Sequence, residues 1–165
     1  MRLLGLDPGL RHTGWGIINS KDNKISWVAS GNISPKISLS LSERLKEIHQ
    51  GLNSIVKKYN PSIAAIEEVF VNMNGQSTLK LGMARGAAIT ACSINEIPVY
   101  EYAPTRVKQS VTGSGRSKKD QVASMVNILL PGCEIKSEDE SDALAVAICH
   151  KIFASSKIHQ MNLRK

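Results

Sequence analysis

Four acidic side chains stand at the ends of apolar segments that are far apart in the sequence. Asp7 closes an apolar run just before a Pro-Gly turn, and Glu67 closes a second apolar run with strand character. Asp139 and Asp142 introduce an apolar helix, and both can face one neighbour if the first helical turn includes them. Hard divalent cations such as Mg²⁺ take oxygen ligands, with water and phosphate completing the octahedron. The four acids therefore predict one metal site.

Each acid taken alone also has an explanation that needs no metal. Asp7 could simply form the turn, and acids at a helix start are favoured by the helix dipole. Glu67 is harder to explain in this way, because an unpaired acid at the end of a buried run is costly. Four converging carboxylates would repel one another, which raises their pKa values and costs stability unless cations neutralise them.

The overall charge has the opposite sign to this acidic group. The chain of 165 residues has 21 Lys and Arg against 14 Asp and Glu, a formal charge of +7. Such an excess favours a polyanionic partner, although a solvated basic surface that aids solubility is the alternative. Acids gathered locally on a basic chain favour a nuclease over that alternative.

The cysteine content and the hydropathy indicate the cellular compartment. Three cysteines without CxxC spacing indicate neither a disulfide framework nor a zinc site, which is typical of a reducing cytoplasm. No apolar stretch approaches the roughly 18 residues of a membrane span, and the first acid comes too early for a signal peptide. We expect a soluble cytoplasmic protein with no membrane partner.

Hydrophobic periodicity divides the chain into strands and helices. Strands are predicted up to Asp7 and over residues 11–18, 25–33, 63–67 and 98–102, and helices over 39–59, 76–95, 103–111, 118–130 and 142–154. Three strands in hairpin succession, followed by strands alternating with helices, predict a mixed sheet covered by helices. Residues 1–154 are expected to form one domain, and residues 155–165 a polar tail.

The segments that carry the acids closely resemble the bacterial RuvC Holliday-junction resolvases. The matching segments are DPG at 7–9 with TGWG at 13–16, AIEEVF at 65–70, LKLGMARG at 79–86 and DESDALAVA at 139–147, in the family's order and spacing. The resemblance implies an α/β RNase H-like fold with a mixed five-stranded sheet flanked by helices. It also implies a homodimer that makes paired symmetric nicks in four-way DNA junctions during recombination and repair, together with the RuvA and RuvB branch-migration complex.

The resemblance assigns catalytic and metal-binding roles to all four acids. Asp7 matches the first family acid, Glu67 the glutamate of the AIE motif, and Asp139 and Asp142 the paired acids of the D-x-x-D-A-L-A segment. Glu140 falls where the family pattern demands no acid, as does Glu68, so both are left out of the site. Two Mg²⁺ ions, with Mn²⁺ as a substitute, would clamp the scissile phosphate, activate water and stabilise the leaving 3′ oxygen.

The resemblance also predicts DNA contacts. The family counterpart of Phe70 reaches toward DNA to stack on bases, although a core position is the alternative for this phenylalanine. Lys108 and Lys119 match basic positions near the cut phosphate. Arg106, Arg116 and Lys118 complete two basic clusters around residues 113–115 and are expected to add backbone affinity, unless they are simply solvated. The helix from residue 76 matches the family dimer helix, but its small residues could instead pack within the chain.

Three other functions compete with junction resolution. A sugar-kinase or actin-like ATPase shares the strand-Asp-Gly beginning, but it normally needs two such domains and a glycine-rich adenosine loop. A non-catalytic junction-binding module would have no reason to retain four acids that oppose DNA binding. A YqgF-type nuclease acting on RNA shares the fold and early motif, whereas the Phe70 segment and the lysine-bearing region favour the DNA resolvase.

Overall fold

The computed structural model describes residues 1–22, 24–69 and 75–155. Its strands are β1 (Arg2–Asp7), β2 (Thr13–Lys21), β3 (Lys24–Ile33), β4 (Ile63–Glu67) and β5 (Val99–Tyr102). Its helices are α1 (Leu41–Tyr59), α2 (Gly75–Ile94), α3 (Pro104–Thr112), α4 (Lys119–Leu129) and α5 (Glu138–Ser155). In this described part of the chain, no helix has the length and apolar character needed to cross a membrane.

The strands form one mixed sheet in the order β3-β2-β1-β4-β5. Strands β1, β2 and β3 are consecutive antiparallel neighbours, whereas β4 runs parallel to both β1 and β5. Parallel neighbours need long crossover connections, and α1 and α2 lie within them. The predicted mixed five-stranded sheet flanked by helices is confirmed.

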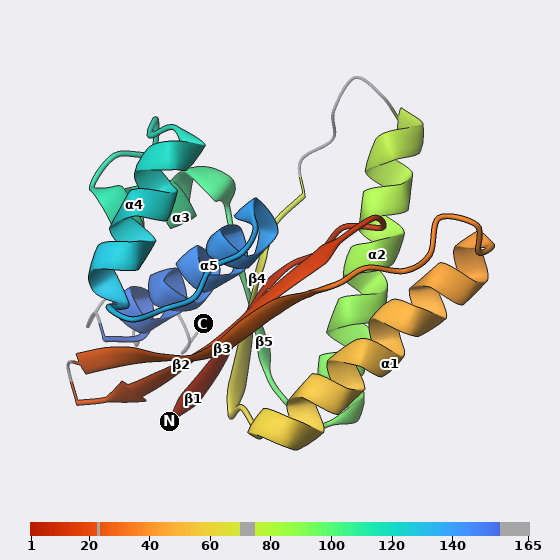
Figure 1. Cartoon of the computed structure of the whole chain (residues 1–165), viewed down its shortest axis with the longest axis horizontal. Coiled ribbons are helices and arrows are strands. Elements are labelled where there is room, and N and C mark those ends of the chain that lie inside the picture. The colour runs from red at the N-terminus through yellow and green to blue at the C-terminus, as the bar shows by residue number, and fades with distance from the viewer. Residues whose placement is uncertain (23, 70–74, 156–165) are drawn as a thin grey trace, which may run out of the picture.

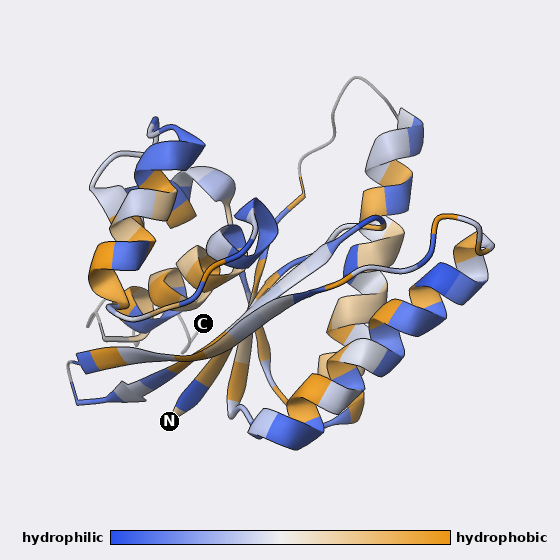
Figure 2. Cartoon of the chain, in the orientation of Figure 1, coloured by the Kyte–Doolittle hydropathy of each residue, from blue (hydrophilic) through white to orange (hydrophobic). Residues whose placement is uncertain are grey.

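The helices cover both faces of the sheet. Figure 1 shows α1 and α2 on one face and α3, α4 and α5 on the other. In Figure 2 the ribbon of α1 alternates between blue and orange, as expected for a helix with one face on a core. The buried side of α1 consists of Ile48, Leu52, Ile55 and Val56.

Strand β1 divides its side chains between the two faces. Leu3 belongs to the core cluster under α5, whereas Leu4 and Leu6 belong to the cluster under α1 and α2. Because successive side chains of a strand point to opposite faces, Gly5 and Asp7 share the face of Leu3. Asp7 therefore ends β1 on the side of the sheet where α5 lies.

Helix α5 packs unusually close to β1 and β2. A Cβ atom added at Gly5 would overlap the carbonyl oxygen of Ala143, and one added at Gly14 would overlap that of Asp139. The backbone of α5 thus touches the backbone of the sheet at two points. The helix is buried continuously from Ala143 to His150.

The start of α5 differs from the prediction. The periodicity predicted a helix over 142–154, but the helix begins at Glu138. The side chain of Ser137 accepts a hydrogen bond from the backbone N–H of Glu140 at 3.2 Å, which satisfies an N-terminal donor and starts the helix earlier. Asp139 and Asp142 consequently lie within the helix, three residues apart.

The glycine contacts make a prediction about stability. Gly5→Ala would place a methyl group against α5 backbone that cannot rotate away, so we expect a loss of about 3 kcal/mol or more in urea unfolding. Gly16 is its partner across the β1–β2 ladder, and a Cβ there would lie 2.5 Å from Cδ2 of the Leu144 side chain. Because a side chain can adjust, we expect Gly16→Ala to cost only about 1–2 kcal/mol. Equal losses of stability in the two variants would show that the α5 backbone can shift to accommodate the added methyl group.

Candidate active site

The sheet topology brings two of the acids to one edge. Strands β1 and β4 are adjacent and parallel, so Asp7 and Glu67 end neighbouring strands at the same edge of the sheet. The first turns of α5 lie against this edge and bring Asp142 to the same place. Asp7, Glu67 and Asp142 line one cleft of about 400 Å³, together with Lys108 and Lys119.

A hydrogen-bond network fixes the start of α5 against β3. The carboxylate of Glu140 accepts bonds from the hydroxyls of Ser30, at 2.8 Å, and Ser137, at 3.4 Å. The amide of Asn32 donates to the Ser137 hydroxyl at 2.8 Å. Because Ser30 and Asn32 belong to β3, this network ties the helix turn that carries Asp139 to the far strand of the sheet.

Glu140 is therefore a residue that the sequence analysis missed. It was left out of the site because the family pattern demands no acid there, yet its side chain is 5% exposed and positions the acidic turn. A signal was present in the sequence. Ser137 and Glu140 have the S-x-x-E spacing of a capping box directly before an apolar run, which indicates a helix start.

Burial and the neighbouring carboxylates raise the pKa values of Asp7 and Glu67. Burial raises the pKa of Asp7 to about 7, with additional repulsion from Asp142, Glu67 and Asp139 in that order. Burial and the charge of Asp142 also raise the pKa of Glu67. All four predicted acids thus belong to one electrostatic group, although Asp139 does not line the cleft.

Two lysine side chains partly neutralise the negative charge of the clustered carboxylates. The ammonium nitrogen of Lys119 lies 3.2 Å from Oδ2 of Asp142 and 3.6 Å from Oε2 of Glu138. Attraction to Asp142 raises the pKa of Lys119. Lys108 and Lys119 both lower the pKa of Glu67, which counteracts the effect of its burial. The lysines therefore stabilise the ionised acids only in part.

The donor chemistry of the site fits a hard divalent cation. Four carboxylates share one region with incomplete compensation, and oxygen ligands of this kind are what Mg²⁺ prefers. Among the described residues, no three or more His, Cys, Asp or Glu side chains are close enough together to hold a metal ion as they stand. In this arrangement the ammonium group of Lys119 lies next to one carboxylate oxygen of Asp142.

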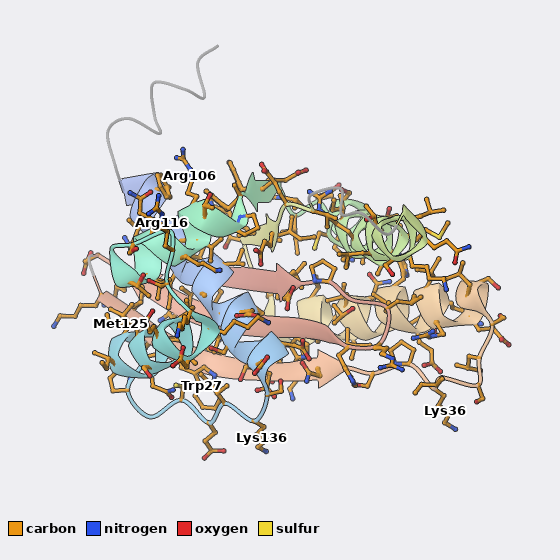
Figure 3. The ribbon with its side chains drawn as sticks, turned by 90° about the horizontal axis from the view of Figure 1, so that it is seen from above. Trp27, Lys36, Arg106, Arg116, Met125 and Lys136 are labelled. Carbon is orange, nitrogen blue, oxygen red and sulfur yellow. The ribbon has the colours of Figure 1, made fainter. Side chains whose placement is uncertain are left out.

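The predicted DNA-contact residues fall into two sets. Lys108 and Lys119 lie at the cleft, whereas Arg106, Arg116 and Lys118 are exposed and do not line it. Figure 3 shows Arg106 and Arg116 toward the same end of the molecule, where α5 ends. The guanidinium of Arg106 lies 4.8 Å from the ring centroid of Phe153. Phe70 lies outside the described residues.

The strand order and the acids at adjoining strand ends place the protein in the RNase H-like class. A family model described as "Crossover junction endodeoxyribonuclease RuvC" matches residues 3–150. The chain is 55% identical to the protein of that name from Paramagnetospirillum magneticum over 150 residues, 91% of this chain and 90% of the relative. It is 50% identical to the one from Gluconobacter oxydans, covering 96% and 95%. The chain belongs to the RuvC family.

Solved structures agree with this assignment. The structure of T. thermophilus RuvC in complex with Holliday junction substrate superposes with a TM-score of 0.87 at 31% identity, covering 93% of this chain and 94% of that one. The yeast mitochondrial Holliday junction resolvase Ydc2 superposes with a TM-score of 0.68 at 14% identity, covering 98% and 83%. The second likeness concerns the fold alone.

The raised pKa of Asp7 predicts how stability depends on pH without metal. Because the folded-state pKa is about 7 and the ordinary value is 3.8, the folded protein retains a proton between these values that the unfolded chain has lost. The free energy of unfolding should therefore fall as pH rises through this window. Asp7→Asn removes the free-energy cost of ionising this buried carboxyl. In chelator at pH 8 we therefore expect the variant to be more stable than wild type by about 2 kcal/mol, and we expect the two stabilities to converge near pH 4.

Thermal unfolding in chelator at several pH values measures this difference. Glu134→Gln, at an exposed acid outside the cleft lining, is the control and should show no such change. An Asp7→Asn protein less stable than wild type at pH 8 would contradict the electrostatic account.

Proposed function

We propose that this protein is a divalent-metal-dependent endonuclease that resolves four-way DNA junctions by paired symmetric nicks during recombination and repair. One observation carries the proposal: Asp7, Glu67 and Asp142 converge on a cleft that also contains Lys108 and Lys119. Carboxylates that can bind cations thus lie beside lysine ammonium groups that can bind phosphate. Membership of the RuvC family supports DNA junctions as the substrate.

The side chains divide the chemistry between them. Asp7, Glu67, Asp139 and Asp142 are the proposed holders of the metal, and those with raised pKa values would release protons when it binds. Bound Mg²⁺, in two positions and replaceable by Mn²⁺, supplies Lewis-acid charge that polarises the phosphate and lowers the pKa of water. Lys108 and Lys119 are proposed to neutralise the phosphate that enters the cleft.

The surface outside the cleft is proposed to carry the arms of the junction. Arg106, Arg116 and Lys118 are exposed and supply sequence-independent attraction for the DNA backbone. Base stacking by Phe70 stays a prediction. The RuvA and RuvB complex is the proposed partner during branch migration, and the cytoplasm is the proposed compartment. Residues 1–154 are the proposed nuclease domain.

Paired cutting implies a homodimer, because one active site per chain then requires two chains related by a two-fold axis. Helix α2 is the proposed interface. Its alanines Ala84, Ala88 and Ala91 are buried against the core, but an added Cβ at Gly82 or Gly86 would meet no atom of the described residues within 4 Å. Intramolecular packing therefore accounts for the alanines and not for the two glycines, which lie one turn apart on the exposed side.

Substitution of the acids tests the catalytic assignment. Asp7→Asn, Glu67→Gln and Asp142→Asn should each lower the rate of junction cleavage by at least about 10²-fold, because loss of a metal ligand removes about 3 kcal/mol of transition-state stabilisation. Binding should survive, since the substitutions remove negative charge near phosphate. Gel-shift affinity and cleavage rate are measured in parallel. A variant that cleaves normally at low Mg²⁺ would remove its residue from the site.

The substrate is tested with a labelled synthetic four-way junction, its matching linear duplex and an RNA hairpin, each with Mg²⁺ and with chelator. We expect paired nicks in the junction alone, and only with metal. Cleavage of the RNA would favour the YqgF-type alternative, and ATP binding without cleavage would favour the ATPase.

Gly82→Arg tests the interface. It places a bulky charge on the exposed side of α2 and should weaken dimerisation at micromolar concentration while leaving the fold intact. Analytical ultracentrifugation measures the association, and circular dichroism checks the fold. A dimeric variant would move the interface elsewhere, whereas a monomeric wild type that makes coordinated nicks would contradict the symmetry argument.

A further inference from the structure

Arg85 connects three elements beside the active site. It lies on α2, and its side chain is 19% exposed. Its Nε–H donates to the backbone carbonyl oxygen of Glu67, the last residue of β4, at 3.2 Å. The Nη2 group of the same guanidinium forms an ion pair with the carboxylate of Glu101 on β5.

The bonded carbonyl belongs to a residue whose side chain faces the cleft. β4 ends at Glu67, and the backbone N–H of Glu68 still donates to the carbonyl oxygen of Tyr102 on β5 at 2.9 Å. The peptide that follows Glu67 is thus held at its N–H by β5 and at its carbonyl oxygen by Arg85, and the second bond completes the constraint on the direction of the Glu67 carboxylate. Leu81, one helical turn before Arg85, lines the same cleft. Helix α2 therefore borders the site through Leu81 and contacts the end of β4 through Arg85.

Glu101 holds the guanidinium in place for this task. It lies opposite Ile66 in the β4–β5 register, one position before the residue whose carbonyl Arg85 contacts. A planar guanidinium presents several N–H donors in a fixed fork and can serve the carboxylate and the carbonyl at once. A lysine carries its charge at one point and cannot reproduce this geometry.

We propose that Arg85 is a positioning residue that sets the orientation of Glu67 for metal binding, and that Glu101 orients Arg85. The proposal rests on the proposed function, since it concerns the same metal site. It also gives α2 a second role: its exposed side carries Gly82 and Gly86 of the proposed interface, and its inner side holds the tip of β4. The position of α2 is thereby linked to the geometry of the acids.

The test compares Arg85→Gln, Arg85→Lys and Glu101→Gln with wild type by two measurements. The first is Mn²⁺ affinity of the DNA-free protein, followed by the electron paramagnetic resonance of free Mn²⁺. The second is the Mg²⁺ concentration that gives half-maximal junction cleavage. Partners that orient a metal ligand typically contribute 10-fold or more to metal affinity, so we expect about a 10-fold weakening for Arg85→Gln and Arg85→Lys, and a smaller one for Glu101→Gln.

Junction affinity in chelator should stay unchanged in all three variants, because Arg85 acts through Glu67 and not on DNA. Lys80→Gln, an exposed basic residue on the same helix, is the matched control and should leave the metal affinity at the wild-type value. Circular dichroism checks the fold, and Glu101→Gln keeps the test decisive if Arg85→Gln does not fold.

The outcomes separate the two proposals. Folded variants that bind Mn²⁺ as wild type does would overturn the role of Arg85 and reduce it to an ion pair that stabilises the fold. A wild-type protein that binds no Mn²⁺ would overturn the metal site itself and the positioning role with it. A wild type that binds Mn²⁺ but leaves junctions intact would overturn the proposed substrate, while the Mn²⁺ affinities of the variants would still decide the role of Arg85.

Discussion

The backbone of α5 lies in direct contact with the backbone of the sheet, and this contact sets the geometry of the acidic cleft. Gly5 and Gly14 leave no side chain between the two layers, so the first turns of α5 lie against β1 and β2. At an ordinary helix-to-sheet distance, the acids of α5 would stand farther from Asp7. The glycines thus set the separation of the carboxylates, and packing of the buried helix maintains it.

This arrangement forces like charges together, and the fold contains specific compensation for the resulting repulsion. The apolar core under α5 opposes separation of the layers, and Glu140 ties the acidic turn to β3 through Ser30. Lys119 pairs with Asp142 and lowers the pKa values of Asp7 and Glu67. The excess of negative charge that remains at the acids favours binding of cations. A site of this kind is stabilised by the ligand that it is proposed to use, which links metal binding to the stability of the fold.

Helix α2 illustrates how one element serves two purposes. Its buried alanines pack on the core, Arg85 reaches the end of β4, and its glycines remain open to an approaching surface. The proposed interface and the proposed positioning of Glu67 thus belong to the same helix.

Most strands and helices, the family resemblance and the four candidate acids could be predicted from the sequence alone, because those signals are local. An apolar run that ends in an acid marks a strand end at Asp7 and Glu67, whereas residues three apart such as Asp139 and Asp142 share a helix face only if the helix includes both. The folded structure was needed to see that Glu140 is buried, that Lys119 pairs with Asp142 and that Arg85 donates to the carbonyl of Glu67. It also separated Lys108, which lines the cleft, from Arg106, which does not. The physical reason is distance along the chain: Ser30 and Glu140 are 110 residues apart, and such contacts exist only when the sheet and helices have assembled around a common core.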